Sequence, residues 1–143
     1  MKIQTVALTV AAVLIAGTSA MAAEHEVKML NKGEKGAMVF EPDLVKIAPG
    51  DTVTFKATDV GHNAETIKGM LPDGAAPFEG KMGQDVAVVF AGPGVYGVTC
   101  KPHLAMGMVA AVVVGDPVNL DAARAVKVPG KAGKRLAELL AGL

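Results

Sequence analysis

Apolar and polar residues alternate along much of the chain in short runs separated by turn signals. The clearest run is 52–57, where polar and apolar residues alternate as in a half-buried strand, directly after the turn signal Ala-Pro-Gly-Asp at 48–51. Because the apolar run 45–47 stands just before this turn, we expect the two segments to form a hairpin. Further strands are predicted at 27–30, 86–90, 95–99 and 108–114, with Gly92-Pro93-Gly94 as a turn. Many short strands with regular turns are typical of an all-β sandwich or barrel.

The C-terminal extension, residues 117–143, differs in composition and predicts two short α-helices at 119–126 and 131–143. It is rich in Ala, Leu, Lys, Arg and Glu, and Asn119 or Asp121 can cap the first helix. Four leucines repeat at helical spacing, namely Leu136, Leu139, Leu140 and Leu143. We expect this stripe to cover one face of the sandwich, a packing role rather than a functional one.

The N-terminal segment 1–22 has the pattern of a secretory signal peptide. A positive Met1-Lys2 start precedes an apolar run, and small residues end at Ala22 with the Ala-x-Ala spacing that signal peptidase reads. The apolar run is too short and too often interrupted to span a bilayer. We therefore expect cleavage after Ala22, a mature domain of residues 23–143 in an exported compartment, and no membrane association after cleavage.

Composition narrows the possible functions. The 143 residues suffice for one domain, and 14 Lys+Arg cancel 14 Asp+Glu. The chain has no net positive charge to attract phosphates, and four Phe, one Tyr and no Trp leave few aromatic rings for base stacking. Nucleic-acid binding is therefore not expected. A single cysteine, Cys100, excludes an internal disulfide. Because an exposed thiol would be liable to oxidation after export, Cys100 is expected to be buried or to be held by a ligand.

A cluster of soft metal ligands lies between two predicted strands. The segment 98–108 contains Cys100, His103, Met106 and Met108, and His62 follows another strand 38 residues before Cys100. Individually, each residue has an ordinary structural explanation, such as core packing or an exposed histidine. Together, two imidazoles, a thiolate and a weak thioether form a ligand set that suits copper cycling between Cu(I) and Cu(II). Copper is favoured over zinc because a thioether suits copper and adds little to a zinc site.

Three motifs carry a family resemblance: Phe40-x-Pro42 with 48–55, Gly-His-Asn at 61–63, and Gly-Val-Tyr-Gly-Val-Thr-Cys-Lys-Pro-His-x4-Met at 94–108. They resemble the blue copper proteins, or cupredoxins, most closely the pseudoazurin group, over essentially all of 23–143. The resemblance implies an eight-stranded Greek-key sandwich holding one type 1 copper. It also implies a non-enzymatic, periplasmic one-electron carrier, with copper nitrite reductase as the acceptor in denitrification.

The axial ligand and the surrounding residues follow from the same resemblance. Met106 gives the Cys-x2-His-x2-Met spacing of amicyanins, whereas Met108 gives the longer spacing of plastocyanins and pseudoazurins. Because amicyanins lack the helical extension, we assign the metal site to His62, Cys100, His103 and Met108. The backbone N–H of Asn63 is expected to donate to the Cys100 sulfur, and its side chain to tie the ligand loops together near Thr99. Pro102 lacks an N–H and should leave the thiolate more electron-rich.

The resemblance also implies that electrons leave through the ring edge of His103. A transient partner, copper nitrite reductase or another periplasmic redox protein, would dock on an apolar patch around His103, for which the candidates are Met38, Pro102 and Leu104. Four lysines could steer an acidic partner: Lys32, Lys35, Lys81 and Lys101. A diffusing carrier of this kind is expected to be a monomer.

Three other hypotheses remain. Cys100, Asn63 and a histidine could form a Cys-His-Asn hydrolase site, although Cys100 ends a strand and lacks the setting of a nucleophile. A non-redox copper carrier is a closer alternative, but it needs an exposed, exchangeable site. Separately, cleavage after Ala22 would leave Ala23-Glu24-His25 as a terminus able to wrap Cu(II) in a square plane.

Overall fold

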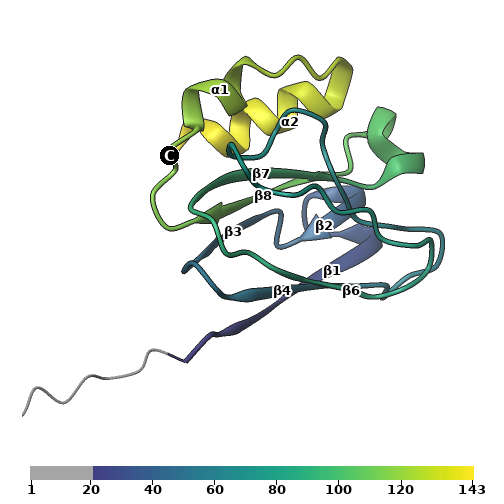
Figure 1. Cartoon of the computed structure of the whole chain (residues 1–143). Coiled ribbons are helices and arrows are strands. Elements are labelled where there is room, and N and C mark those ends of the chain that lie inside the picture. The colour runs from purple at the N-terminus through teal and green to yellow at the C-terminus, as the bar shows by residue number, and fades with distance from the viewer. Residues whose placement is uncertain (1–20) are drawn as a thin grey trace, which may run out of the picture.

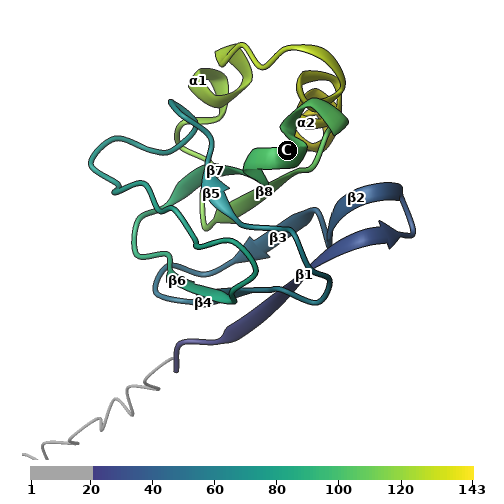
Figure 2. The same ribbon diagram turned by 90° about the vertical axis from the view of Figure 1, so that its right-hand side faces the viewer.

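The computed structural model describes residues 21–143, which form a two-sheet sandwich with helices on one side (Figures 1 and 2). The predicted signal peptide lies outside the described residues except for its last two positions. The strands are β1 (Glu24–Gly33), β2 (Gly36–Glu41), β3 (Leu44–Ile47), β4 (Thr52–Lys56), β5 (Glu65–Thr66), β6 (Val86–Val89), β7 (Gly94–Thr99) and β8 (Val109–Val114). The helices are the 3-10 helix η1 (Lys101–Met106), α1 (Leu120–Ala125) and α2 (Gly130–Ala141). The expected eight strands and two C-terminal helices are confirmed.

Each sheet has four strands and mixes parallel with antiparallel pairs. The first sheet has the order β2-β1-β4-β6, and the second has the order β3-β8-β7-β5. The pairs β1–β4 and β3–β8 are parallel, and the remaining pairs are antiparallel. The antiparallel pair β7–β8 positions the metal-ligand segment, because it places the residues after β7 beside those before β8.

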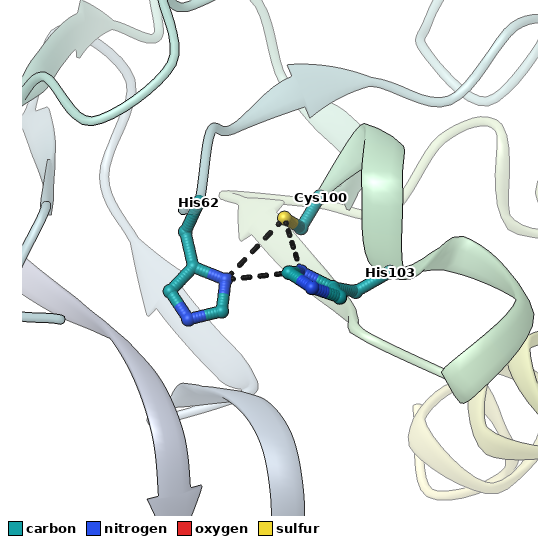
Figure 3. A group of neighbouring side chains, drawn as sticks. All are labelled: His62, Cys100 and His103. Carbon is teal, nitrogen blue, oxygen red and sulfur yellow. Dashed lines mark hydrogen bonds between the residues drawn. The ribbon is translucent and has the colours of Figure 1, made fainter. Parts of the chain in front are cut away.

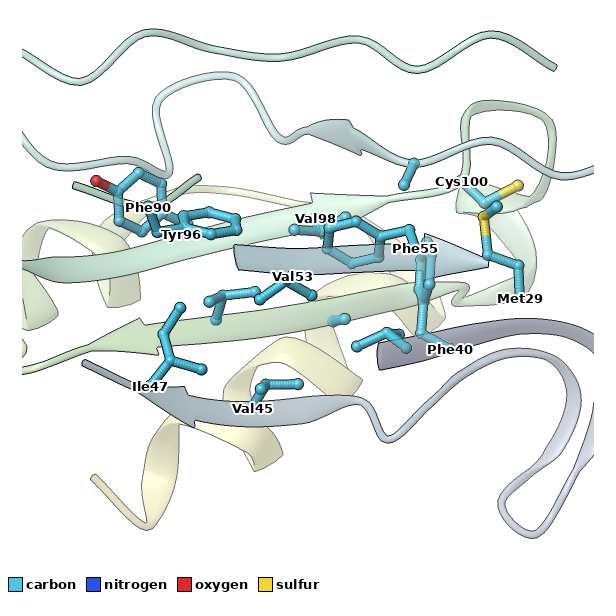
Figure 4. Close-up of a cluster of buried hydrophobic side chains, with 14 of the residues drawn as sticks. Met29, Phe40, Val45, Ile47, Val53, Phe55, Phe90, Tyr96, Val98 and Cys100 are labelled. Atoms are coloured by element: carbon cyan, nitrogen blue, oxygen red, sulfur yellow. The ribbon is translucent and has the colours of Figure 1, made fainter. Parts of the chain in front are cut away.

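The main core lies between the two sheets, and Cys100 stands at one end of it (Figure 4). Contacting aromatic rings run through this core, and at the end opposite Cys100 Phe90 lies edge-on to Tyr96 at 4.9 Å between ring centroids. Every residue of β7 and β8 is buried. The reason is that α1 and α2 cover the outer face of this second sheet, so that both faces of β7 and β8 are shielded from water (Figure 1).

The predicted hairpin of 45–47 and 52–57 is wrong. The turn exists, with the Asp51 N–H donating to the Ala48 carbonyl at 3.1 Å, but β3 pairs with β8 while β4 pairs with β1 and β6. The alternation of polar and apolar residues indicates which side chains of each strand are buried, but not which strands pair with each other. Val45 and Phe55 enter the same core from opposite sheets, so the pattern is satisfied without pairing of the two strands.

The helical extension packs as the leucine stripe predicts. Leu136, Leu139 and Leu140 are buried under the second sheet, and Leu143 is partly buried against them. Asn119 occupies the N-cap position of α1 without a capping bond. Its side chain instead accepts from the Val95 N–H at 2.6 Å and donates to the Val95 carbonyl at 2.9 Å, which anchors the extension to β7.

Among the described residues, no helix is long and apolar enough to cross a membrane.

Candidate metal centre

The second sheet carries a loop that closes on itself between β7 and β8. Cys100 directly follows β7, and His103 lies within η1. The Cys100 N–H donates to the Met108 carbonyl and the Met108 N–H donates to the His103 carbonyl, both at 3.1 Å. These bonds fold the eleven-residue segment 98–108 back on itself. The Cys100 and His103 side chains point toward His62, which lies in the loop between β4 and β5 (Figure 3).

Three ligand atoms converge at this end of the sandwich. The Cys100 Sγ lies 3.6 Å from His62 Nδ1 and 3.3 Å from His103 Nδ1, and the two Nδ1 atoms are 3.2 Å apart. A point close to this triangle can lie about 2.0 Å from both nitrogens and about 2.3 Å from the sulfur, the usual lengths of metal–imidazole and metal–thiolate bonds. The three side chains therefore fit a metal ion without rearrangement, and the fold brings together residues that the sequence separates by 38 positions.

His62 is held in the form that binds a metal. Its ring is fully buried, and burial, reinforced by the neighbouring His103, lowers the pKa of His62 below its ordinary value. The imidazole is therefore neutral at pH 7. Its Nε2–H donates to Asn31 Oδ1 at 2.8 Å, which leaves the Nδ1 lone pair directed toward Cys100.

Asn31 is a functional residue that sequence reasoning missed. It lies in β1, 31 positions from His62, and belongs to no motif around the ligands. Its backbone N–H donates to Asp59 Oδ2 at 2.7 Å, which fixes the end of β1 beside the loop that carries His62. Nothing in the sequence distinguishes this asparagine from any other polar residue near the end of a strand.

Cys100 has the surroundings of a ligand and not of a nucleophile. It is buried, and burial raises the pKa of its thiol, an effect opposed by hydrogen bonds from the backbone N–H groups of Asn63 and His103. A reactive cysteine needs partial exposure and a lowered pKa. The Cys-His-Asn hydrolase hypothesis therefore finds no support, whereas two imidazole nitrogens within 3.6 Å of the buried sulfur suit a metal-bound thiolate.

Asn63 joins the two ligand loops as expected, but through a different partner. Its Oδ1 accepts from the Lys101 N–H at 2.8 Å, and its Nδ2 donates to the Gly80 carbonyl at 3.2 Å. Thr99 was the expected neighbour, but its hydroxyl donates to the Met108 carbonyl at 3.1 Å instead. Asn63 therefore contacts the ligand loop one residue after Cys100, at the Lys101 N–H.

The two candidate methionines differ sharply in their surroundings. Met108 is fully buried at the end of the core beside Cys100, whereas 43% of Met106 is exposed. Pro102 stands in the first turn of η1, where its missing N–H costs no helical hydrogen bond.

The residues expected around His103 reach the surface to different extents. His103, Met38 and Leu104 are half-buried, and Pro102 is exposed. Of the four lysines, Lys35 pairs with Asp43 at 2.7 Å and Lys101 pairs with Glu79 at 3.3 Å. Within residues 21–143, Lys32 and Lys81 are exposed and form no ion pair.

The structure gives other partners to the proposed terminal copper donors. The Ala23 N–H donates to Asp51 Oδ1, and His25 Nε2 lies 2.9 Å from Asp51 Oδ2. Glu24 and His25 also pair with β4 in parallel register. A square-planar Cu(II) site would have to break these contacts, so this arrangement does not favour it.

Comparisons with known proteins agree with this geometry. Residues 27–115 match the model of the family described as copper binding proteins, plastocyanin/azurin family. The chain is 50% identical over 133 residues to the pseudoazurin of Paracoccus pantotrophus, covering 92% of each chain. It is 51% identical over 136 residues to the pseudoazurin of Methylorubrum extorquens strain AM1, covering 94% of this chain and 92% of that protein.

A solved structure shows the same fold. The pseudoazurin crystal structure from Methylobacterium extorquens AM1 aligns with a TM-score of 0.81 and 53% identity, covering 83% of this chain and 98% of that chain. The buried thiol and two converging imidazoles, together with these matches, identify copper as the cofactor. The chain therefore belongs to the plastocyanin/azurin family of copper-binding proteins and, within it, to the pseudoazurins, which carry electrons and are not enzymes.

Proposed function

We propose that this protein is a periplasmic one-electron carrier that holds a single type 1 copper through His62, Cys100, His103 and Met108. The observation that carries the proposal is the convergence of Cys100 Sγ and two histidine Nδ1 atoms, all within 3.6 Å of one another. Bound copper supplies one-electron chemistry between Cu(I) and Cu(II). The protein supplies a ligand triangle that is already assembled, so that little has to move when the charge changes.

The choice of Met108 as the fourth ligand is supported by its burial. Met108 is fully buried, and its N–H donates to the carbonyl of the ligand His103. Met106 is partly exposed and lies in η1. A weak, distant thioether tunes the potential of a His2Cys site, and a buried sulfur can do so without competition from water.

The buried site also argues against the non-redox copper carrier. Such a carrier exchanges its ion with partners and needs accessible ligands, whereas His62 and Cys100 are both fully buried. His103 is the half-exposed member of the triangle and offers the shortest route for an electron to the surface. We infer that a partner docks over His103 and the neighbouring Pro102 and Leu104, and that copper nitrite reductase is the acceptor.

Export is part of the proposal. Residues 1–22 would direct the chain to the periplasm and be removed, leaving 23–143 as a single monomeric domain. An oxidising compartment is compatible with the lone Cys100, because the thiol is buried and held as a metal ligand.

Visible absorption of residues 23–143 with one equivalent of Cu(II), before and after ascorbate, tests the redox site. We expect an intense blue band that bleaches on reduction, and its absence from the matched variant Cys100→Ser. A weakly coloured wild-type protein would refute the proposal. Rapid loss of copper to a chelator, without reversible oxidation and reduction, would favour the carrier hypothesis.

Electron transfer to copper nitrite reductase tests the partner. We expect the stopped-flow rate to fall as salt rises, because exposed lysines attract an acidic partner over a Debye length of about 10 Å at 0.1 M. A salt-independent rate would remove the steering role of the lysines, and no transfer would remove this acceptor.

A further inference from the structure

One arginine of the helical extension contacts both the metal-ligand loop and the turn between β1 and β2. Arg135, in α2, donates from Nη1 to the Gly107 carbonyl at 2.8 Å and from Nη2 to the Lys35 carbonyl at 3.2 Å. Within residues 21–143 its guanidinium forms no ion pair with a carboxylate. Both of its described bonds therefore go to backbone carbonyls, and the second joins residues 100 positions apart.

The first contact holds the peptide group between two ligand residues. The Gly107 carbonyl and the Met108 N–H belong to the same planar peptide unit. Arg135 holds this unit by its oxygen, while the His103 carbonyl accepts from its N–H at 3.1 Å. The unit is thus clamped from both sides, and it connects the half of the loop that carries His103 with Met108.

Gly107 fits this clamp for a steric reason. Its φ of 84° lies in the left-handed region that favours glycine. A Cβ at this position would also come within 2.9 Å of the Lys131 side chain, one helical turn before Arg135. The loop and α2 are therefore packed too closely for any larger residue, and the carbonyl is presented directly to the guanidinium.

The second contact reaches the hairpin that supports His62. Lys35 lies in the turn between β1 and β2, and its amine also pairs with Asp43. Four residues earlier in this hairpin, Asn31 accepts the Nε2–H of His62. The guanidinium thus joins the loop that carries His103 to the hairpin that orients His62.

We propose that Arg135 is a positioning residue for the copper centre, holding the ligand loop and the β1–β2 hairpin at a fixed separation. This inference rests on the proposed copper site. It extends the role of the C-terminal extension beyond the packing that the leucine stripe predicts. Two fork-like N–H donors are required, because a lysine ammonium is a point charge that cannot align with both carbonyls in the same way.

Three variants separate this role from general effects of charge or stability. Arg135→Ala removes both bonds, and Arg135→Lys keeps the charge and most of the stem. The matched control is Lys134→Ala, which removes the same charge from the adjacent, exposed position of α2. Should Arg135→Ala not fold, Arg135→Lys carries the same comparison.

The first readout needs no copper. Amide hydrogen exchange in the metal-free protein compares Met108 with Val112 in the middle of β8, which reports global unfolding. Losing a hydrogen bond to a charged donor corresponds to about 10-fold to 100-fold faster local opening. We therefore expect Met108 exchange to accelerate at least about 10-fold in Arg135→Ala and to stay unchanged in Lys134→Ala. Val112 should accelerate only as far as the lower stability of the variant, measured by denaturant unfolding, accounts for.

The second readout is the copper-loaded protein. In Arg135→Ala we expect altered visible and electron paramagnetic resonance spectra and a lower reduction potential, since a relaxed site approaches the geometry that Cu(II) prefers. Arg135→Lys should restore these properties only in part.

Two results would overturn the inference. They are Met108 exchange in Arg135→Ala equal to that in Lys134→Ala, and full restoration of the wild-type exchange and spectra by lysine. A wild-type protein that is not blue would refute the proposed function, while the exchange measurement would still decide whether Arg135 holds the loop.

Discussion

Removing the Asn31 side chain tests whether the partner of His62 contributes to copper binding. In Asn31→Ala the Nε2–H of His62 loses the acceptor that it contacts at 2.8 Å. The backbone N–H bond from residue 31 to Asp59 remains, so the end of β1 keeps its position. The imidazole can then adopt the tautomer with its proton on Nδ1. Nδ1 is the nitrogen that faces Cys100, so this tautomer has no lone pair there to bind a metal.

The size of the effect follows from the surroundings of the two residues. Removing the hydrogen-bond partner of a metal-bound histidine costs about 10-fold to 100-fold in metal affinity. His62 is fully buried, which favours a large effect, but Asn31 is exposed and water can replace part of the lost bond. We therefore expect a loss near the lower limit, about 10-fold, or about 1.4 kcal/mol of binding free energy.

A competition titration with a chelator of known affinity measures this loss. Asn31→Asp is the matched control, since its carboxylate accepts the same bond and should retain tight binding. Because a carboxylate makes the imidazole more basic, Asn31→Asp should also lower the reduction potential. An Asn31→Ala protein with wild-type affinity and an unchanged visible spectrum would refute the reasoning.

Three further predictions concern the loop and the first strand. Met108→Leu should shift the potential and the visible spectrum strongly and Met106→Leu only weakly, and the opposite order by voltammetry and absorption would show that Met106 is the axial ligand. Pro102→Ala should raise the potential, because a new N–H can donate toward the sulfur, and a potential that stays or falls would reject this. Hydrogen bonds, first from the Ala23 N–H, lower the pKa of Asp51, so its stabilising effect is complete above the ordinary aspartate pKa and is lost as pH falls through the lowered value. Thermal unfolding of wild type and Asp51→Asn should therefore converge at low pH, and a constant difference would contradict the linkage.

The fold was predictable where local pattern and burial coincide. The run that becomes β8 is apolar throughout, the run that becomes β7 is apolar apart from Tyr96 and Thr99, and the leucine stripe of α2 has helical spacing. The pairing of strands was not predictable in the same way, as the supposed hairpin of β3 and β4 shows. Alternation reports the buried face of a strand, but both sheets bury their side chains in one core, so the pattern is the same whichever sheet a strand joins.

In the metal centre, too, some residues could be predicted from the sequence and others could not. Cys100 and His103 are three residues apart, and a loop between two strands brings them together, so their relation is visible in the sequence. Asn31 and Arg135 are invisible there, because their partners lie 31 and 28 or more positions away. Asn31 forms one such bond to His62 and Arg135 forms two to backbone carbonyls, and all of them depend on how β1 and α2 are placed in space.

The sequence by itself therefore determined the chemistry of this protein: which donor atoms exist, that a lone cysteine stands near a histidine and two methionines, and which residues are apolar enough to form the core. The tertiary structure alone decided which donors meet, which methionine is buried, and which side chains hold the ligand loops. The physical reason is one of range. Residue type and periodicity act over a few neighbouring positions, whereas hydrogen-bond distance and burial depend on the packing of two sheets and a helix that are far apart along the chain.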